Sequence, residues 1–268
     1  MRVTEPRYLE AIEHVAFVCG CGHSGTTLLA RILGAHPEVF VPSNETNAFL
    51  TESKMEERLA RIERNTLASA RPYLVEKTPR HLRKIDLIRA LVPGAKFVII
   101  VRDGRDVTAS IGKRENGDFA GAISRWVDDN RRVLRERGKA DVHIVRYEDI
   151  VTRPEATIRK VTAFLGLTFD SKMLRYYEQP TNWFGRAMVR ETFRPGREHG
   201  DRRNWQVNQP IFDGRGKWKK DLPEAFRARF DKGPPAEVML SFGYDTPLAF
   251  RIDRALRRTA RRLLRRPA

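Results

Sequence analysis

Short apolar runs alternate with amphipathic segments along the chain up to Leu165. The runs with the length and apolar content of buried strands are 14–19, 73–76, 96–101 and 142–146. Apolar residues at helical spacing predict helices at 24–35, 79–91, 118–137 and 155–165, and another that begins at about Gly104. Short strands separated by helices are typical of a parallel sheet that is covered on both faces. We therefore expect an α/β fold in a single domain, with its parallel sheet flanked by helices on both faces.

This pattern changes near Pro180. From there to Trp218 the chain is rich in Arg, Gly, Pro and Asn, which is typical of a binding lid or an insertion. At the C-terminus, apolar residues return at helical spacing, and residues 251–268 hold eight Arg and one Asp. We predict a domain over 1–250 and a basic amphipathic tail over 251–268. The tail either lies on a membrane surface or packs loosely on the domain as a solvated basic end.

Composition narrows the class of protein. The 268 residues are 41% hydrophobic and 32% charged, as in folded globular proteins. The apolar stretches are too short to cross a membrane, and the polar residues 1–12 are not typical of a signal peptide. The two cysteines, Cys19 and Cys21, suit neither a disulfide framework nor a zinc site. We expect a cytoplasmic protein that binds no metal.

The formal net charge of +17 indicates anionic partners. Nucleotides, nucleic acid, acidic glycans and a membrane surface all belong to this group. The chain shows no nucleic-acid motif and no strand platform in which basic and aromatic residues alternate. We therefore expect no specific nucleic-acid partner, and the motifs must decide among the other anions.

A glycine-rich turn follows the first predicted strand, with the sequence Gly20-Cys21-Gly22-His23-Ser24-Gly25-Thr26-Thr27. Backbone N–H groups in such a turn, together with the N-terminus of the next helix, form a cradle for an anion. The glycine spacing is that of a Walker A loop, but Thr26 stands where that motif has its phosphate-binding lysine. The turn therefore predicts phosphate binding without the chemistry of an ATPase or GTPase. Close packing of strand against helix would require glycines here as well.

A second candidate for phosphate binding follows the strand at 96–101. Arg102 comes directly after this strand, and Ser110 lies two turns into the next helix, so that both face the carboxyl edge of the sheet. An Arg and a hydroxyl suit a phosphate monoester. The alternative is a surface network in which Arg102 pairs with Asp103 and Asp106.

Together these segments resemble the sulfotransferases that use 3′-phosphoadenosine 5′-phosphosulfate (PAPS). The 5′-phosphosulfate loop of that family, Lys/Arg-Ser-Gly-Thr-Thr, is similar to residues 23–27, and its 3′-phosphate motif is similar to Arg102 with Ser110. Tyr147 lies in a segment that resembles the one whose tyrosine approaches the adenine. Residues 215–219 resemble the late Arg/Gly/Trp loop that closes on the 3′-phosphate.

The resemblance runs from about Val15 to Tyr244 and implies a P-loop-like domain that transfers a sulfuryl group from PAPS to a hydroxyl or amine of an unidentified acceptor. The donor site that it implies consists of Gly22, His23, Ser24, Gly25, Thr26, Thr27, Arg102, Ser110, Tyr147, Arg215, Gly216 and Lys217. Two other functions stay open on the residues alone. One is a P-loop nucleotide or small-molecule kinase, and the other is a non-catalytic protein that binds polyanions.

In-line sulfuryl transfer needs a positively charged group beside the leaving oxygen, to stabilise the negative charge that develops there. The resembling family has Lys or Arg just before its Ser-Gly-Thr-Thr, where this chain has His23. Either protonated His23 or Lys77, at the end of the second predicted strand, supplies that charge. Lys77 could instead form only a surface salt bridge.

The acceptor also needs a general base. Glu45, on the loop after the first helix, is the first candidate, because related enzymes that act on peptides and glycans have a catalytic Glu in a similar position. Ser43 or Asn44 could also cap a helix with Glu45 in its first turn. His81 is the second candidate. A further histidine, His36, precedes Pro37 and is more typical of a helix end.

Overall fold

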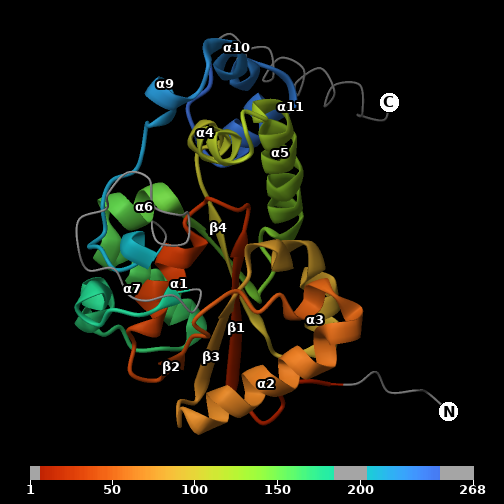
Figure 1. Cartoon of the computed structure of the whole chain (residues 1–268), viewed down its shortest axis with the longest axis vertical. Coiled ribbons are helices and arrows are strands. Elements are labelled where there is room, and N and C mark those ends of the chain that lie inside the picture. The colour runs from red at the N-terminus through yellow and green to blue at the C-terminus, as the bar shows by residue number, and fades with distance from the viewer. Residues whose placement is uncertain (1–6, 184–203, 248–268) are drawn as a thin grey trace, which may run out of the picture. The chain divides into compact units, whose positions relative to one another are not determined.

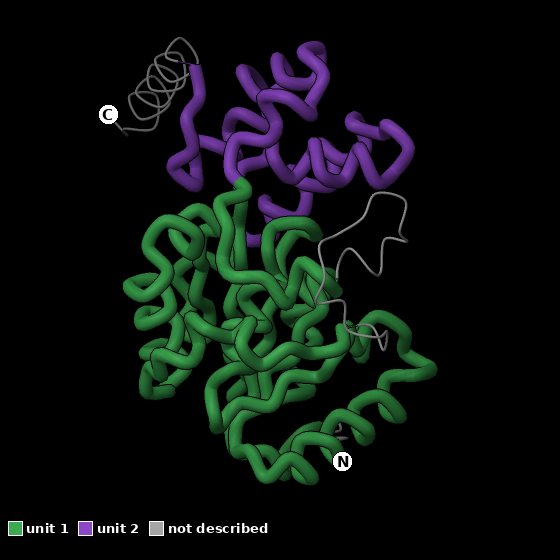
Figure 2. Tube along the Cα trace, turned by 60° about the vertical axis from the view of Figure 1, so that its left-hand side comes forward, with its two compact units in different colours: residues 1–102, 135–214 green, residues 103–134, 215–268 purple. Residues whose placement is uncertain are grey.

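The computed structural model describes residues 7–183 and 204–247 (Figure 1). The chain divides into two compact units, one of residues 1–102 and 135–214 and the other of residues 103–134 and 215–268 (Figure 2). The predicted tail and its boundary after residue 250 lie outside the described residues. Within the described ranges, no helix combines the length and apolar character that crossing a bilayer requires.

The first unit contains a five-stranded parallel sheet in the order β2-β3-β1-β4-β5. Its strands are β1 (His14–Gly20), β2 (Val39–Phe40), β3 (Tyr73–Lys77), β4 (Lys96–Val101) and β5 (Val142–Arg146). Four of them lie where the apolar runs predict strands, and the predicted α/β class is confirmed. The two-residue β2 is too short to leave a pattern in the sequence.

The α-helices of both units are α1 (Thr26–Gly34), α2 (Met55–Ala68), α3 (Ile85–Leu91), α4 (Gly104–Arg114), α5 (Phe119–Glu136), α6 (Tyr147–Thr152), α7 (Pro154–Leu165), α9 (Trp218–Asp221), α10 (Glu224–Arg227) and α11 (Gly233–Ser241). The 3₁₀ helices are η1 (Ala48–Leu50), η2 (Glu52–Lys54), η3 (Pro79–Lys84), η4 (Ser171–Glu178) and η6 (Ala228–Asp231). The single helix expected over 79–91 is wrong. It is η3 followed by α3, because Lys84, the last residue of η3, has a non-helical φ of −127°.

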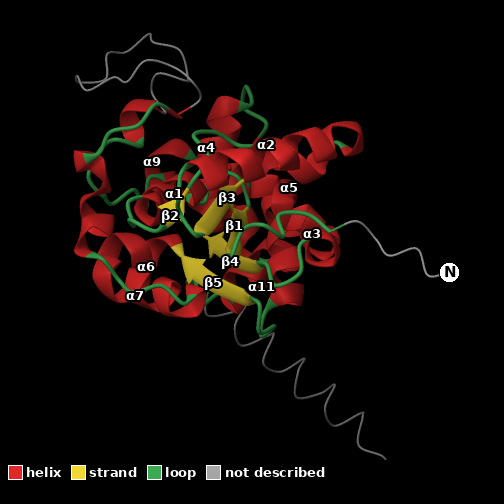
Figure 3. Cartoon of the chain, turned by 90° about the horizontal axis from the view of Figure 1, so that it is seen from below, coloured by secondary structure: helices red, strands yellow, loops and turns green. Residues whose placement is uncertain are grey.

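Alternate residues of each strand face opposite sides of the sheet, and helices cover both sides (Figure 3). On one side, apolar residues of the strands, such as Val18 and Val75, join the core that α1, α6 and α7 complete. On the other side, Phe17 stacks on Phe97 with ring centroids 5.8 Å apart, and its edge meets Phe49 of η1. Burying each such side chain stabilises the fold by about 1.5–3 kcal/mol.

The second unit has an aromatic core of its own. The ring of Trp126, on α5, is fully buried and meets Phe230 of η6 edge-on, at 5.6 Å between centroids. Gly104 begins α4 against this pair, and a Cβ atom there would lie 2.7 Å from the Trp126 ring. The start of α4 therefore needs a residue without a side chain.

Candidate functional site

The glycine-rich turn between β1 and α1 is held in place by close contacts. A Cβ atom on Gly20 would lie 2.4 Å from the carbonyl oxygen of Ile100, and one on Gly25 would lie 2.8 Å from the Tyr147 ring. Gly25 has a φ of 102°, and half-buried His23 has a φ of 68°, in the left-handed region that few non-glycine residues adopt. The backbone of this turn is thus fixed by its neighbours.

Polar groups that fit an anion line this turn. Gly22 and Ser24 are buried, and the Ser24 hydroxyl has no hydrogen-bond partner among the described residues. Leaving such a group unsatisfied costs about 1–3 kcal/mol, and a phosphate or sulfate oxygen would satisfy it. Thr26 and Thr27 open α1, whose first turn has no acidic residue to oppose an anion. The donor set therefore fits the phosphosulfate group that the sequence predicts.

Arg102 and Tyr147 lie beside the turn. The Arg102 guanidinium lies over the Tyr147 ring, 4.1 Å from its centroid. Its Nη1 donates to the His23 carbonyl at 3.3 Å, and its Nη2 donates to the Gly214 carbonyl at 2.7 Å. The Tyr147 hydroxyl accepts from the Gly214 N–H at 3.2 Å. The structure thus brings together the predicted phosphate loop, the predicted 3′-phosphate arginine and the predicted adenine tyrosine.

The acidic residues after β4 have partners within the second unit. Asp103 caps α4 and pairs with Arg105 at 2.6 Å. Asp106 accepts the backbone N–H groups of Gly216 and Trp218, both at 2.9 Å. Arg105 therefore forms an ion pair with one of the two acidic residues of this segment.

Within the second unit, exposed Ser110 lies one helical turn beyond Asp106 on α4. Because Asp106 holds the backbone at Gly216, the segment that carries Arg215 and Lys217 adjoins the same stretch of α4. Each group predicted for the 3′-phosphate in this unit therefore lies at α4 or at the loop attached to it.

Glu45 and Lys77 form an ion pair at the end of β3. Lys77 Nζ lies 2.8 Å from Glu45 Oε1, and the two side chains are 1% and 30% exposed. The Lys77 ammonium also lies 4.8 Å from the centroid of the Trp183 ring. Lys77 pairs in register with Val18, two residues before Gly20 of the turn. The predicted base and the predicted cation therefore meet next to the predicted phosphate loop.

Two alternatives for this pair are wrong. Lys77 is buried, so its ion pair with Glu45 is not a surface salt bridge. Glu45 is not in the first turn of a helix, because the chain from Asn44 to Asn47 is irregular and η1 begins only at Ala48.

Comparison with known proteins shows the family to which the chain belongs. The model of the sulfotransferase family matches residues 16–72 and 48–171. The chain belongs to the sulfotransferase family. Protein-tyrosine sulfotransferase A of Caenorhabditis elegans is 27% identical to this sulfotransferase, over 85% of this chain and 67% of the worm protein.

Two solved structures share the fold of this sulfotransferase. The sulfotransferase domain of the Synechococcus PCC 7002 olefin synthase matches with a TM-score of 0.59 and 22% identity, over 88% of this chain and 96% of that domain. Mouse sulfotransferase SULT7A1, complexed with PAP, matches with a TM-score of 0.55 and 17% identity, over 86% of this chain and 87% of the mouse chain.

The sulfotransferase holds His81 in its interior. This side chain is 0% exposed, its Nδ1 lies 2.8 Å from Glu76 Oε2, and its Nε2 accepts the Phe49 N–H at 3.4 Å. His36 lies two residues after the end of α1, and its Nε2 is 2.8 Å from the Thr168 carbonyl. Both ring nitrogens of His81 are therefore engaged inside the protein, whereas the carboxylate of Glu45 reaches solvent.

Glu76 is a buried carboxylate outside the set of site residues predicted from the sequence. Burial favours its neutral form, but His81 and the hydroxyls of Thr46 and Thr78 outweigh burial and lower the pKa of Glu76. A signal for it existed in the sequence, because a Glu at the end of an apolar strand is unusual unless it has partners.

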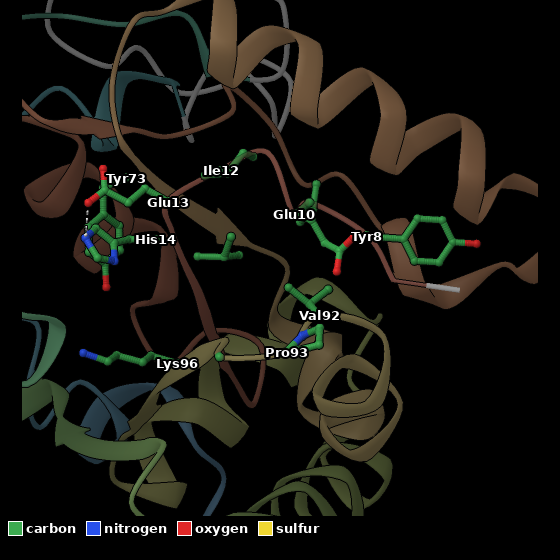
Figure 4. Close-up of a pocket in the computed structure, with 12 residues that line it drawn as sticks. Tyr8, Glu10, Ile12, Glu13, His14, Tyr73, Val92, Pro93 and Lys96 are labelled. Atoms are coloured by element: carbon green, nitrogen blue, oxygen red, sulfur yellow. Dashed lines mark ion pairs between the residues drawn. The ribbon is translucent and has the colours of Figure 1, made fainter. Parts of the chain in front are cut away.

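A cavity of about 310 Å³ opens at the opposite edge of the sheet (Figure 4). His14, Tyr73 and Lys96, the first residues of β1, β3 and β4, contribute to its lining. Parallel sheets bind ligands at the carboxyl ends of their strands, and this cavity contains none of the predicted site residues.

Groups of three or more His, Cys, Asp or Glu side chains that could hold a metal ion are absent from the described part of this sulfotransferase. Metal-free catalysis stays a prediction.

Proposed function

We propose that this sulfotransferase transfers a sulfuryl group from PAPS to a hydroxyl or amine acceptor, with Glu45 as general base and Lys77 as the cation at the leaving group. The observation that carries the proposal is the 2.8 Å ion pair between Glu45 and Lys77, at the end of the strand next to the phosphate loop. The transfer needs a base at the acceptor and a positive charge at the leaving oxygen, and this pair supplies one group of each kind.

In the proposed reaction the acceptor oxygen attacks sulfur. A bond forms between them, and the bond from sulfur to the 5′-phosphate oxygen breaks. Glu45 takes the acceptor proton, and the electron pair of the broken bond stays on the 5′-phosphate oxygen. Lys77 stabilises the charge that grows on that oxygen. The N–H groups of the turn before α1 bind the same end of the nucleotide.

Several groups support PAPS as the donor. The buried Ser24 hydroxyl suits its phosphosulfate, and the Tyr147 ring, already covered by Arg102, offers an aromatic partner for adenine. Mouse SULT7A1, which shares the fold, was solved with PAP. Ser110, Arg215, Gly216 and Lys217 stay predicted ligands of the 3′-phosphate.

The first acceptor to test is a tyrosyl hydroxyl in a peptide, because the Caenorhabditis elegans relative is a protein-tyrosine sulfotransferase. A phenol with a pKa of about 10 needs a base to attack at neutral pH. The assay incubates the full chain with PAPS and tyrosine peptides and measures the mass added to the peptide. Formation of PAP without a sulfated peptide would move the acceptor to another hydroxyl or to an amine.

The product nucleotide PAP is expected to bind at least about tenfold more tightly than AMP, since each charge-assisted contact to its extra phosphate contributes about 1.5–3 kcal/mol. Titration calorimetry with the two nucleotides measures the ratio. Arg102→Gln should reduce the preference, because it removes the guanidinium beside the turn. Equal affinities in the wild-type protein would contradict PAPS as the donor.

His23 is expected to matter only if its imidazolium shares the leaving-group charge with Lys77. In that case activity falls as the pH rises past about 6.5, the ordinary pKa of histidine, and His23→Arg keeps its activity at higher pH. The measurement compares the kcat profiles of the wild type and His23→Arg over the same pH range. A wild type fully active at pH 9, with His23→Ala unimpaired, would leave His23 a purely structural part of the turn.

A further inference from the structure

The carboxylate of Glu76 connects three polar side chains inside the first unit. Its Oε1 accepts the Thr46 and Thr78 hydroxyls, each at 2.7 Å, and its Oε2 lies 2.8 Å from His81 Nδ1. Glu76 is 1% exposed, and each of the three partners is buried as well. A buried carboxylate with this many partners is a strong constraint on its surroundings.

The same carboxylate, directly or through its partners, binds four consecutive backbone N–H groups of residues 46–49. The N–H of residue 46 donates to Glu76 Oε1 at 3.4 Å, and the N–H of residue 47 donates to the Thr78 hydroxyl at 3.1 Å. The N–H of residue 48 donates to the Thr46 hydroxyl at 3.3 Å, and that of residue 49 donates to His81 Nε2 at 3.4 Å. This stretch begins directly after Glu45.

The negative charge of Glu76 sets the direction of every bond in the network. Because a carboxylate only accepts, both hydroxyls and the His81 Nδ1–H must donate to it. Their remaining lone pairs, including that on His81 Nε2, then face the loop and can accept its N–H groups. A glutamine at position 76 would bring an NH₂ group, which must reverse at least one of these bonds and set two donors against each other.

We propose that Glu76 is a positioning residue that fixes the loop carrying Glu45. This inference rests on the proposed function of Glu45 as the base. Glu76 and Lys77 are neighbours on β3 and face opposite sides of the sheet. Lys77 pairs with the Glu45 carboxylate itself, and Glu76 secures the backbone that follows it. Two adjacent side chains thus fix the base, Lys77 through its carboxylate and Glu76 through the backbone that follows it.

A double-mutant cycle tests the proposal. Glu76→Gln is expected to lower kcat by about 10²-fold, the cost of a misplaced catalytic group, while the affinity for PAP stays unchanged. In a chain that already carries Glu45→Gln, the same change should lower the residual kcat less than twofold. The assay uses PAPS with the acceptor found for the wild type, and kcat is expressed per PAP-binding site, so that unfolded chains do not count.

Thr78 supplies a matched pair of variants in case Glu76→Gln folds poorly. Thr78→Val keeps the shape but loses the hydroxyl that links Glu76 to residue 47, and it should lower kcat by about tenfold. Thr78→Ser keeps the hydroxyl and should retain most of the wild-type kcat.

The outcomes separate this proposal from the proposed function. An unchanged kcat in Glu76→Gln, or an equal loss with and without Glu45→Gln, overturns the positioning role. So does failure of both Glu76→Gln and Thr78→Val to bind PAP, since the network would then be required for the fold as a whole. Full activity of Glu45→Gln, or a wild type that does not bind PAP, is instead a failure of the proposed function.

Discussion

Replacement of Glu45 by glutamine is expected to lower kcat by roughly 10²–10⁴-fold, the usual contribution of a general base, while PAP binds as tightly as before. The amide keeps the shape of the side chain but cannot take a proton from the acceptor. The phosphate loop and Arg102 are untouched, so nucleotide affinity should not change. Turnover of PAPS under saturating acceptor gives kcat, and calorimetry with PAP gives the affinity.

Glu52→Gln is the matched control for this variant. Glu52 begins η2, seven residues further along, and is exposed. The control removes the same charge from the same region and should leave kcat within twofold. If Glu45→Gln kept most of its activity and His81→Ala did not, His81 would be the base, despite its burial.

Lys77→Met is expected to lower kcat by roughly 10²–10³-fold, the usual effect of removing one group that stabilises charge in the transition state. Methionine fills the space of the lysine stem beside Trp183 but brings no charge to the leaving oxygen. The loss in kcat should be larger than the loss in nucleotide affinity, because Lys77 acts on the charge that grows during the transfer and supports nucleotide binding less. Single-turnover measurements with bound PAPS isolate this chemical step.

Lys77→Arg and Lys84→Met are the controls for this second variant. The first keeps a positive charge at the site and should recover part of the activity. The second removes an exposed lysine at the end of η3 and should have no effect. A fully active Lys77→Met together with an inactive His23→Ala would assign the leaving-group charge to His23.

Four of the five strands could be predicted from the sequence, because each of the four is a short apolar run whose signal is local. The break between η3 and α3 could not, because apolar residues such as Leu82 and Ile85 keep a helical spacing across it. Spacing reports which side chains are buried. It does not report a change of backbone angle at a polar residue such as Lys84.

In the candidate site, too, some residues could be predicted from the sequence and others could not. The phosphate loop is a local motif, so its residues could be selected before the fold was known. The role of Glu76 depends on Thr46, 30 residues away in the chain, and on the direction of hydrogen bonds that only the folded loop defines. The sequence shows that a glutamate at the end of an apolar strand is unusual, but it does not show which residues are the partners of Glu76.

Alternation at the end of β3 also limits how this gene can change. An in-frame insertion or deletion of one codon within Tyr73–Lys77 would exchange the faces of Glu76 and Lys77. The ammonium would then meet the aromatic rings of Phe17 and Phe49, and the carboxylate would turn toward the face of α1. Each charge would lose its partner, at a cost of about 3–5 kcal/mol for a broken buried pair. Lineages descending from this gene should therefore tolerate substitutions in the strand more readily than any change in its length.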